Sequence, residues 1–176
     1  MAAELLRVED VGGFLTKISE TVRADFGFDK VSISILDEEK GVFTDHALAG
    51  YTKEEIAEME AGPMAFDVET VLPDFNEAFK ISRIAYYIPY EKQTGQPSDF
   101  MVVRDKLAAT RPRTSPDAWH ELDLLYFALS DRHGAMIGYM QVDYPIDGKI
   151  PSKETISEVG LFTTIAAVGI ENSVRY

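Results

Sequence analysis

The sequence predicts an α+β fold, in which an antiparallel sheet carries the helices from the two ends of the chain on one of its faces. The prediction rests on apolar residues with helical spacing near both ends and on two pairs of strand-like segments between them. With 176 residues the chain has the usual size of one domain, so we expect a single hydrophobic core and one domain over residues 1–176.

The first expected element is a helix that ends near residues 25–27. Its apolar side chains recur at steps of three and four and so share one face: Val8, Val11, Leu15, Ile18 and Val22. Gly12 and Gly13 interrupt this face, and each costs up to about 1 kcal/mol of helix stability relative to alanine. The spacing also has heptad character, which predicts a parallel contact with a second copy of the chain.

Two strands and a short helix follow. Residues 31–35 alternate between apolar and polar side chains, and residues 42–48 form a second strand-like segment after a polar turn, so the pair predicts a hairpin. Thr52 then precedes Glu55 by three positions, which is the spacing of a capping box that opens a short helix ending near Glu60.

The middle of the chain is less regular. Residues 64–80 hold aromatic side chains and Pro73 without one period, which predicts short helical turns over a core. Residues 81–88 are rich in aromatic and β-branched side chains and predict a strand. Residues 91–118 contain three prolines and no clear period. We expect this long loop to be a functional lid, with a helical piece near residues 100–108.

The last third predicts a second hairpin and a closing helix. Residues 122–129 and 136–143 are the two strands, joined by a turn in which Gly134 can adopt a positive φ. Ser152 is the expected N-cap of a helix that keeps its apolar period to the end of the sequence. We therefore expect this helix to continue into an output domain of a longer protein.

The C-terminal third also contains the most specific motif of the sequence. It comprises residues 137–156 (IGYMQVDYPIDGKIPSKETI) and residues 166–172 (AAVGIEN). Both segments resemble the last strand, the loop after it and the closing helix of the GAF domain family of regulatory modules. Residues 83–89 (RIAYYIP) and 119–123 (WHELD) resemble GAF domains found in microbial sensor histidine kinases.

The resemblance implies a GAF-like, PAS-related sheet of about six antiparallel strands. It also implies a ligand pocket on the face opposite the terminal helices, covered by short helices and loops. Members of the family bind cyclic nucleotides, tetrapyrroles, small metabolites or no ligand, and they pass the state of the pocket to an output domain through the end helices. The fold does not decide among these ligands.

Charge and composition exclude several classes of function. With 17 basic and 30 acidic residues, the net charge of −13 repels phosphate backbones and anionic lipids, so neither nucleic acid nor a membrane is an expected partner. The absence of cysteine excludes a cysteine-linked chromophore, and any cofactor, of unknown identity, would bind without a covalent bond. The first residues lack the pattern of a secretory signal, so we expect a cytoplasmic protein.

Catalytic and metal-binding motifs are missing from the sequence. The glycine motifs of phosphate-binding loops and nucleophile elbows do not occur, and His46, His120 and His133 lack the spacing of a metal site. The methionine sulfoxide reductases with a GAF fold need cysteines, and this chain has none. Asp143 and Asp147 are interpreted as turn residues rather than as paired catalytic carboxylates. We therefore expect no enzymatic activity.

The expected ligand site lies where the third strand borders the segment entering the next strand. Aromatic and polar side chains there can stack on a planar group and bind its polar edge. The candidate ligand-binding residues are Arg83, Tyr87, Trp119, His120, Asp123 and Tyr126. Tyr86 and Tyr87 must point to opposite faces of a strand, so only one of them can line a pocket. Two simpler interpretations stay open: Trp119 packs in the core without contacting a ligand, and Arg83 is an exposed arginine at a strand end.

Two classes of function remain. The first is a small-molecule sensor of a signal-transduction protein such as a sensor histidine kinase, in which the basic residues of the 91–118 loop offer cations to an anionic ligand. The second is a structural dimerisation module without a ligand, favoured by the apolar stripes of the terminal helices. In both classes we expect a homodimer formed through the terminal helices.

Overall fold

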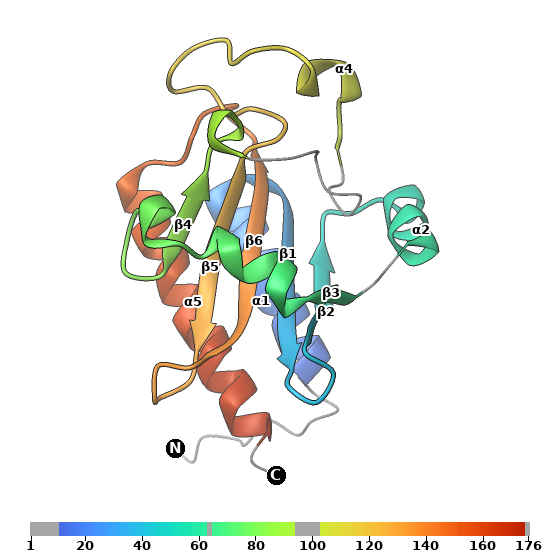
Figure 1. Ribbon diagram of the computed structural model, residues 1–176, viewed down its shortest axis with the longest axis vertical. Coiled ribbons are helices and arrows are strands. Elements are labelled where there is room, and N and C mark those ends of the chain that lie inside the picture. The colour runs from blue at the N-terminus through green and yellow to red at the C-terminus, as the bar shows by residue number, and fades with distance from the viewer. Residues whose placement is uncertain (1–10, 63–64, 94–102, 175–176) are drawn as a thin grey trace.

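The structure, a computed structural model, describes residues 11–62, 65–93 and 103–174 (Figure 1). These residues form one antiparallel sheet of six strands in the order β3-β2-β1-β6-β5-β4, which confirms the predicted fold class. The strands are β1 (Phe28–Asp37), β2 (Val42–Ala49), β3 (Ala65–Asp67), β4 (Ala85–Ile88), β5 (Leu124–Ser130) and β6 (Met136–Pro145). The α-helices are α1 (Val11–Phe26), α2 (Lys53–Ala61), α3 (Val68–Val71), α4 (Lys106–Ala109) and α5 (Lys153–Val174).

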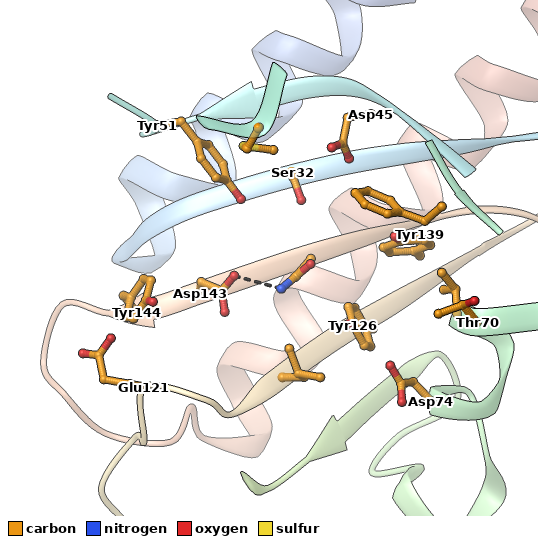
Figure 2. A pocket seen from close by; sticks show the side chains of 15 residues that line it. Ser32, Asp45, Tyr51, Thr70, Asp74, Glu121, Tyr126, Tyr139, Asp143 and Tyr144 are labelled. Carbon is orange, nitrogen blue, oxygen red and sulfur yellow. Dashed lines mark hydrogen bonds between the residues drawn. The ribbon is translucent and has the colours of Figure 1, made fainter. Parts of the chain in front are cut away.

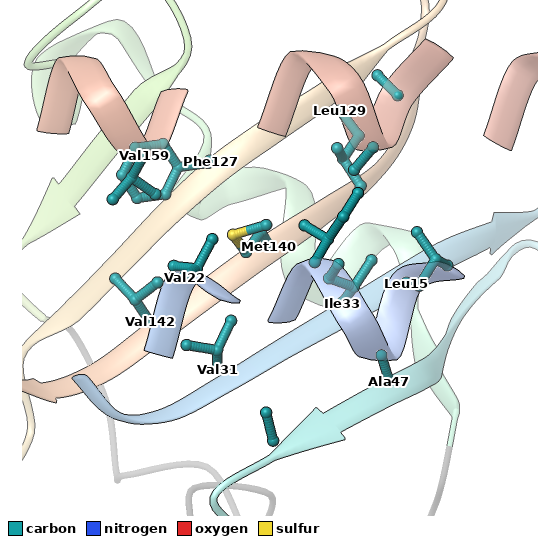
Figure 3. Packing of buried hydrophobic residues seen from close by; sticks show 14 of the residues in the cluster. Leu15, Val22, Val31, Ile33, Ala47, Phe127, Leu129, Met140, Val142 and Val159 are labelled. Atoms are coloured by element: carbon teal, nitrogen blue, oxygen red, sulfur yellow. The ribbon is translucent and has the colours of Figure 1, made fainter. Parts of the chain in front are cut away.

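The long helices α1 and α5 pack together on one face of the sheet (Figure 1). The apolar side of α1 faces the strands, as its spacing predicts, and its buried apolar residues are Val11, Leu15, Ile18 and Val22. Figure 3 shows Leu15 and Val22 beside the aliphatic side chains of β1 and β6. Each such side chain contributes about 1.5–3 kcal/mol when it is fully buried. Val8, which was predicted on the same side, lies outside the described residues.

Helix α5 starts where the sequence predicts. The Ser152 Oγ accepts a hydrogen bond from the Thr155 backbone N–H at 3.2 Å, as an N-cap does. Farther along α5, a Cβ at Gly169 would collide with the ring of Phe14, so the glycine allows α1 and α5 to approach closely. The opposite side of α5 exposes three large apolar residues: Leu161, Ile165 and Val168. Neither α5 nor any other helix within the described ranges combines the length and hydropathy needed to cross a membrane.

The other face of the sheet carries aromatic side chains under a cover of short helices. Phe75 stacks on Tyr126 of β5 with ring centroids 5.3 Å apart, and Tyr126 meets Tyr139 of β6 edge to face at 5.4 Å. Phe43 of β2 packs against the same Tyr139 at 5.1 Å. The cover consists of α3 and of 3-10 turns at Leu72–Asp74 and Glu77–Phe79, so the short helical turns predicted for this region are confirmed.

The two predicted hairpins and the capping box are also confirmed. Strand β1 pairs with β2 and β5 pairs with β6, and Gly134 in the second turn has a φ of 85°. The Thr52 Oγ1 accepts the Glu55 N–H at 3.1 Å, and the Glu55 carboxylate accepts the Thr52 N–H at 2.9 Å. Both hydrogen bonds of the predicted capping box are therefore present.

Two strand assignments differ from the prediction. Strand β4 begins at Ala85 rather than Ile81, because the Ser82 Oγ accepts the Ala85 N–H at 3.2 Å and the chain bends there. Arg83 lies in this bend and is exposed, so it is not part of the strand. Strand β3 was not predicted, since its three residues are too few for a period of two to be recognised, and it forms only by pairing with β2.

Candidate functional site

A cavity of about 90 Å³ lies between the aromatic face of the sheet and its cover (Figure 2). Its walls come from strands β1, β2, β3, β5 and β6, from α2 and α3, from the 3-10 turn at Leu72–Asp74, and from the segments that precede β5 and follow β2. The lining residues are Ser32, Asp45, Tyr51, Met59, Phe66, Thr70, Val71, Asp74, Glu121, Leu124, Tyr126, Tyr139, Gln141, Asp143 and Tyr144. The cavity is on the face opposite α1 and α5, where the resemblance to GAF domains implies a pocket.

Strand alternation explains which side chains reach the cavity. On β6, Tyr139, Gln141 and Asp143 face it, whereas the intervening Met140 and Val142 are fully buried in the core under the helices. On β1 and β5 the same rule turns Ser32 and Tyr126 toward the cavity and their sequence neighbours toward the helices. On these strands a period of two produces both the core and the cavity wall, except at Tyr144, which also lines the cavity and has a φ of 53°.

Carboxylates dominate the polar part of the wall. Removal from water raises the pKa of Asp143 to about 7, although the Gln141 amide donates a 2.9 Å hydrogen bond to it and Lys30 lies near enough to favour its charge. Burial also raises the pKa of Asp45, whose carboxylate accepts the Ser34 hydroxyl at 2.6 Å, and it raises that of Asp74. These groups are held in an environment that resists their ionisation.

Tyrosine rings form much of the remaining wall. Burial raises the pKa of Tyr139 to about 12 and also raises the pKa of Tyr126 and of Tyr51, so all three remain neutral phenols at physiological pH. A neutral phenol supplies a ring face for packing and a hydroxyl that can donate or accept a hydrogen bond. The cavity thus combines flat apolar surfaces with polar groups that can orient a ligand.

Two cations near the cavity are already paired. The ammonium of Lys30 contacts the Glu55 carboxylate at 2.7 Å and is 5.2 Å from the ring centre of Tyr51. The guanidinium of Arg104 lies 4.3 Å from the ring centre of Tyr144 and makes ion pairs of 3.4 Å with Asp29 and 3.9 Å with Glu121. Neither side chain lines the cavity.

The predicted ligand-binding residues fall into three places. Tyr126 lines the cavity, and Arg83 is exposed in the bend before β4. Tyr87, Trp119, His120 and Asp123 come together at the edge of the sheet, away from the cavity lining. Of the two neighbouring tyrosines on β4, Tyr86 is the one turned toward the aromatic face, where its ring centroid is 5.1 Å from that of Phe75.

This edge cluster is organised around the fully buried Asp123 carboxylate. It accepts hydrogen bonds from the Tyr87 hydroxyl at 2.7 Å, from the Tyr90 N–H at 3.0 Å and from the His120 N–H at 2.9 Å. Arg113 donates two further bonds of 2.7 Å to it and also pairs with Glu91, whose pKa it holds at about 2. The cluster fastens the 110–118 part of the long loop to the sheet.

The side chains of His120 and Trp119 are also used within this cluster. The His120 ring stacks on Tyr90 at 3.6 Å, its Nδ1 accepts the Leu122 N–H, and its Nε2–H donates to the Arg111 carbonyl at 2.6 Å. Trp119 packs beside Tyr87 against the core under the helices, and its buried Nε1–H has no partner within the described residues. This position agrees with the alternative interpretation, in which Trp119 packs in the core and does not contact a ligand.

The long loop also meets the cavity wall. The Arg104 N–H donates to the Tyr144 hydroxyl at 3.0 Å, and the Asp105 N–H donates to the Glu121 carboxylate at 3.2 Å. Asp105 also caps α4, which lies in the loop. Part of the helical piece predicted near residues 100–108 is therefore confirmed, while residues 100–102 lie outside the described ranges.

Several cavity residues were missed by reasoning from the sequence. Asp143 is a residue of β6 and not a turn residue, whereas Asp147 does accept a turn hydrogen bond, from the Lys149 N–H at 2.9 Å. The polar alternation of Tyr139, Gln141 and Asp143 within an apolar strand was the available signal. Asp45 and Asp74 had no comparable signal, because only the folded chain brings them to the cavity. In the part of the chain that the structure describes, acidic and histidine side chains form no group of three or more suited to a metal ion.

Comparison with known proteins supports the fold assignment. No family model matches the sequence, and no curated protein matches it. Solved structures do match: a GAF domain/HD domain protein from Geobacter sulfurreducens has a TM-score of 0.64 at 11% identity, covering 95% of each chain. A methyl-accepting chemotaxis protein has a TM-score of 0.61 at 18% identity, covering 93% of this chain and 90% of that one.

A further similar structure is the GAF domain of an Acinetobacter phosphoenolpyruvate-protein phosphotransferase, with a TM-score of 0.61 at 14% identity. The match covers 94% of this chain and 84% of that one. These matches extend over nearly the whole chain, and they agree with the six-stranded antiparallel sheet and its helices. The protein therefore has the GAF domain fold.

Proposed function

We propose that this chain is a regulatory domain that binds a small molecule in the cavity and reports its presence through α1 and α5. The observation that carries the proposal is the cavity itself, with its tyrosine and carboxylate wall on the face opposite the two long helices. A concave site with ring surfaces and a few polar groups is the usual form of a small-molecule site.

Strand β6 offers a physical route from the cavity to the helices. Its Asp143 and Gln141 side chains line the cavity, and its Met140 side chain points the other way, where Thr163 of α5 approaches the sulfur at 3.9 Å. A ligand that favours one position of β6 would therefore change the packing under α5. The ligand can act only through a difference in its affinity for the two positions.

The structural neighbours support a place in a multidomain signalling protein. They include the chemotaxis and phosphotransferase proteins named above and a bacteriophytochrome from R. palustris. The resemblance of residues 83–89 and 119–123 to sensor histidine kinases favours a kinase as the output domain, in the cytoplasm. Two other neighbours are free methionine-R-sulfoxide reductases, whose GAF-fold chemistry needs cysteines that this chain lacks, so we propose a sensor rather than an enzyme.

Native mass spectrometry of the purified protein tests the sensor function. We expect a non-covalent mass addition that is released on denaturation and identified in the supernatant. The Asp143→Asn variant should lose the addition, and Glu154→Gln, which removes an equal charge from the exposed start of α5, should keep it. A wild-type protein that carries no addition, and whose melting temperature does not change in a metabolite extract, contradicts the proposal.

A second candidate function is a dimerisation module. It is favoured by the exposed apolar stripe of α5 formed by Leu161, Ile165 and Val168, whose spacing of four and three residues places them on one side. The corresponding stripe of α1 is buried against the sheet and offers no such surface among its described residues. Self-association without any retained ligand would favour this candidate over the sensor.

A further inference from the structure

The charge of the cavity wall bears on the class of ligand that it takes. Among the described residues that line it, four are carboxylic acids and none is lysine, arginine or histidine. Figure 2 shows the four acids on different sides of the cavity: Asp45 from β2, Asp74 from the turn after α3, Glu121 from the segment before β5, and Asp143 from β6. An anion placed there would meet carboxylates from several directions.

The four acids differ in how far the protein already neutralises them. Glu121 has Arg104 at 3.9 Å and the Asp105 N–H at 3.2 Å, and Asp45 has the Ser34 hydroxyl. Among the described residues the Asp74 carboxylate has no ion-pair or hydrogen-bond partner, and the Asp143 carboxylate accepts a hydrogen bond from the neutral Gln141 amide. Among the described residues, Glu121 is thus the one of the four acids with a cation within 4 Å, and Asp74 and Asp143 also lack the hydroxyl donor that Asp45 has.

Asp74 and Asp143 are both partly buried, and partial burial without a close cation makes their charged forms costly. Removal from water is the only cause that raises the pKa of Asp74, and it is the largest cause for Asp143. A buried carboxylate is stabilised by a charge-assisted hydrogen bond from a cation. Lys30 and Arg104 cannot supply one without leaving Glu55 or Asp29, so the cation would have to come with the ligand.

The rings and the size of the cavity fit an organic body. Tyr126 and Tyr139 present ring surfaces to the cavity between the acids, and such surfaces attract both apolar groups and cations. One water molecule occupies roughly 10–15 Å³ of cavity volume. The 90 Å³ cavity therefore has room for about six to nine atoms of that size, so we expect a ligand with about that number of non-hydrogen atoms. A ligand of this size is much smaller than a cyclic nucleotide or a tetrapyrrole.

We propose that the cavity selects a small organic cation, in which a protonated amine is carried on a short apolar body. The ammonium group donates hydrogen bonds to Asp74 or Asp143, and the body packs against Tyr126 and Tyr139. This inference rests on the proposed sensor function and names its ligand class. It replaces the anionic ligand expected from the sequence, because none of the described residues that line the cavity is cationic and because Arg104 and Arg113 of the loop are engaged in ion pairs.

A titration with probes of similar size and different charge tests this inference. The probes are n-butylamine, 1-butanol and sodium butyrate, added to ¹⁵N-labelled protein at pH 8 and constant ionic strength and followed by amide chemical shifts. We expect n-butylamine to bind saturably and to shift amides of residues 124–126 and 141–143. Butyrate should leave these amides unchanged, and 1-butanol should bind more weakly than n-butylamine.

Variants locate the charge that is recognised. If the ammonium group binds to Asp74, the Asp74→Asn variant should bind n-butylamine about tenfold more weakly, and the same holds for Asp143 and Asp143→Asn. The inference requires this loss in at least one of the two variants. Glu154→Gln lowers the negative charge of the domain by the same amount and should leave the affinity unchanged. The spectra also show whether each variant is folded, and the comparison of probes on the wild type does not depend on any variant.

The outcomes separate this inference from the proposed function. Butyrate binding at these amides as tightly as n-butylamine overturns the cationic class and leaves a ligand-binding cavity in place. Equal affinity of n-butylamine for both Asn variants and the wild type also overturns it. If no probe shifts these amides, the inference fails, and the sensor function then depends on whether native mass spectrometry finds a retained ligand of another kind.

Discussion

The two faces of the sheet use the same strands in opposite ways. Under α1 and α5 the strands present aliphatic side chains with almost no exposed surface, such as Val31, Ile33 and Met140. Under the short helices the alternate positions of the same strands present Ser32, Tyr139 and carboxylates around a cavity. The first face buries apolar surface and stabilises the fold, whereas the second retains polar groups that raise the free energy of the folded state.

Within one strand, residues that stabilise the fold therefore alternate with residues that are available for binding. A substitution on the helix face should change the free energy of unfolding, and its neighbour on the cavity face should mainly change binding. Natural sites often carry groups that lower stability for the sake of function. The following tests challenge that division, beginning with the largest expected change in stability.

Phe127→Ala should cause the largest loss. Phe127 is fully buried on the helix face of β5, and truncation of such a ring costs about 3–5 kcal/mol. Tyr126→Phe, at the adjacent position facing the cavity, removes only a hydroxyl and should change the free energy of unfolding by less than about 1 kcal/mol. Urea denaturation of both variants measures the difference, and equal losses would contradict the division between the faces.

Arg113→Met should be the next most severe change. The variant keeps much of the side-chain volume but leaves the buried Asp123 without its cation, which costs about 3 kcal/mol when a buried pair is broken. The double variant Arg113→Met, Asp123→Leu removes both charges and should recover part of this loss. Denaturation curves decide the point, because a double variant less stable than the single one would show that the ion pair is not the cause.

Asp143→Asn should stabilise the domain at high pH. The folded-state pKa of Asp143 is about 7, above its ordinary value of 3.8, so between these values the folded state holds a proton that the unfolded state lacks. Stability from this group is therefore present at low pH and is lost as the pH rises through 7. The charged or titratable groups that act on Asp143 or respond to it are Lys30, Tyr51, Glu121, Asp123, Tyr126 and Tyr144.

The measurement compares wild type and Asp143→Asn at pH 5 and pH 8. The variant should gain about 2–3 kcal/mol relative to the wild type on going from pH 5 to pH 8, because each pH unit between 5 and 7 costs the wild type about 1.4 kcal/mol. Asp147→Asn, in the turn after β6, is the control and should show no such gain. A pH-independent difference between wild type and Asp143→Asn would mean that the carboxylate is not held out of water.

Leu161→Glu should have the smallest effect on stability and a distinct effect on association. Leu161 is 67% exposed on α5, so the free energy of unfolding should change by no more than about 0.5 kcal/mol. If the α5 stripe forms the homodimer, light scattering should show a dimer of the wild type that the variant loses. Leu15→Glu is not a suitable surface probe, since Leu15 is fully buried and the variant should unfold the domain.

The sequence determined the elements whose signals are local. The capping box at Thr52, the alternation of β1 and the period of α1 and α5 each lie within a few residues and do not depend on distant partners. The C-terminal motif was specific enough to indicate the GAF fold, which the strand order and the structural neighbours bear out. The position of the pocket opposite the helices followed from that resemblance.

The tertiary structure alone decided which side chains meet. Trp119, His120 and Asp123 were predicted as a ligand site because they are polar or aromatic and close in sequence. In the folded chain Arg113, from the long loop, binds the Asp123 carboxylate, so the cluster attaches the loop to the sheet. Asp45 and Asp74 reach one cavity from separate parts of the chain, so no local pattern could join them. Periodicity specifies the face on which a side chain lies, but the charge of a site depends on long-range contacts that pair some groups and leave others without a counterion.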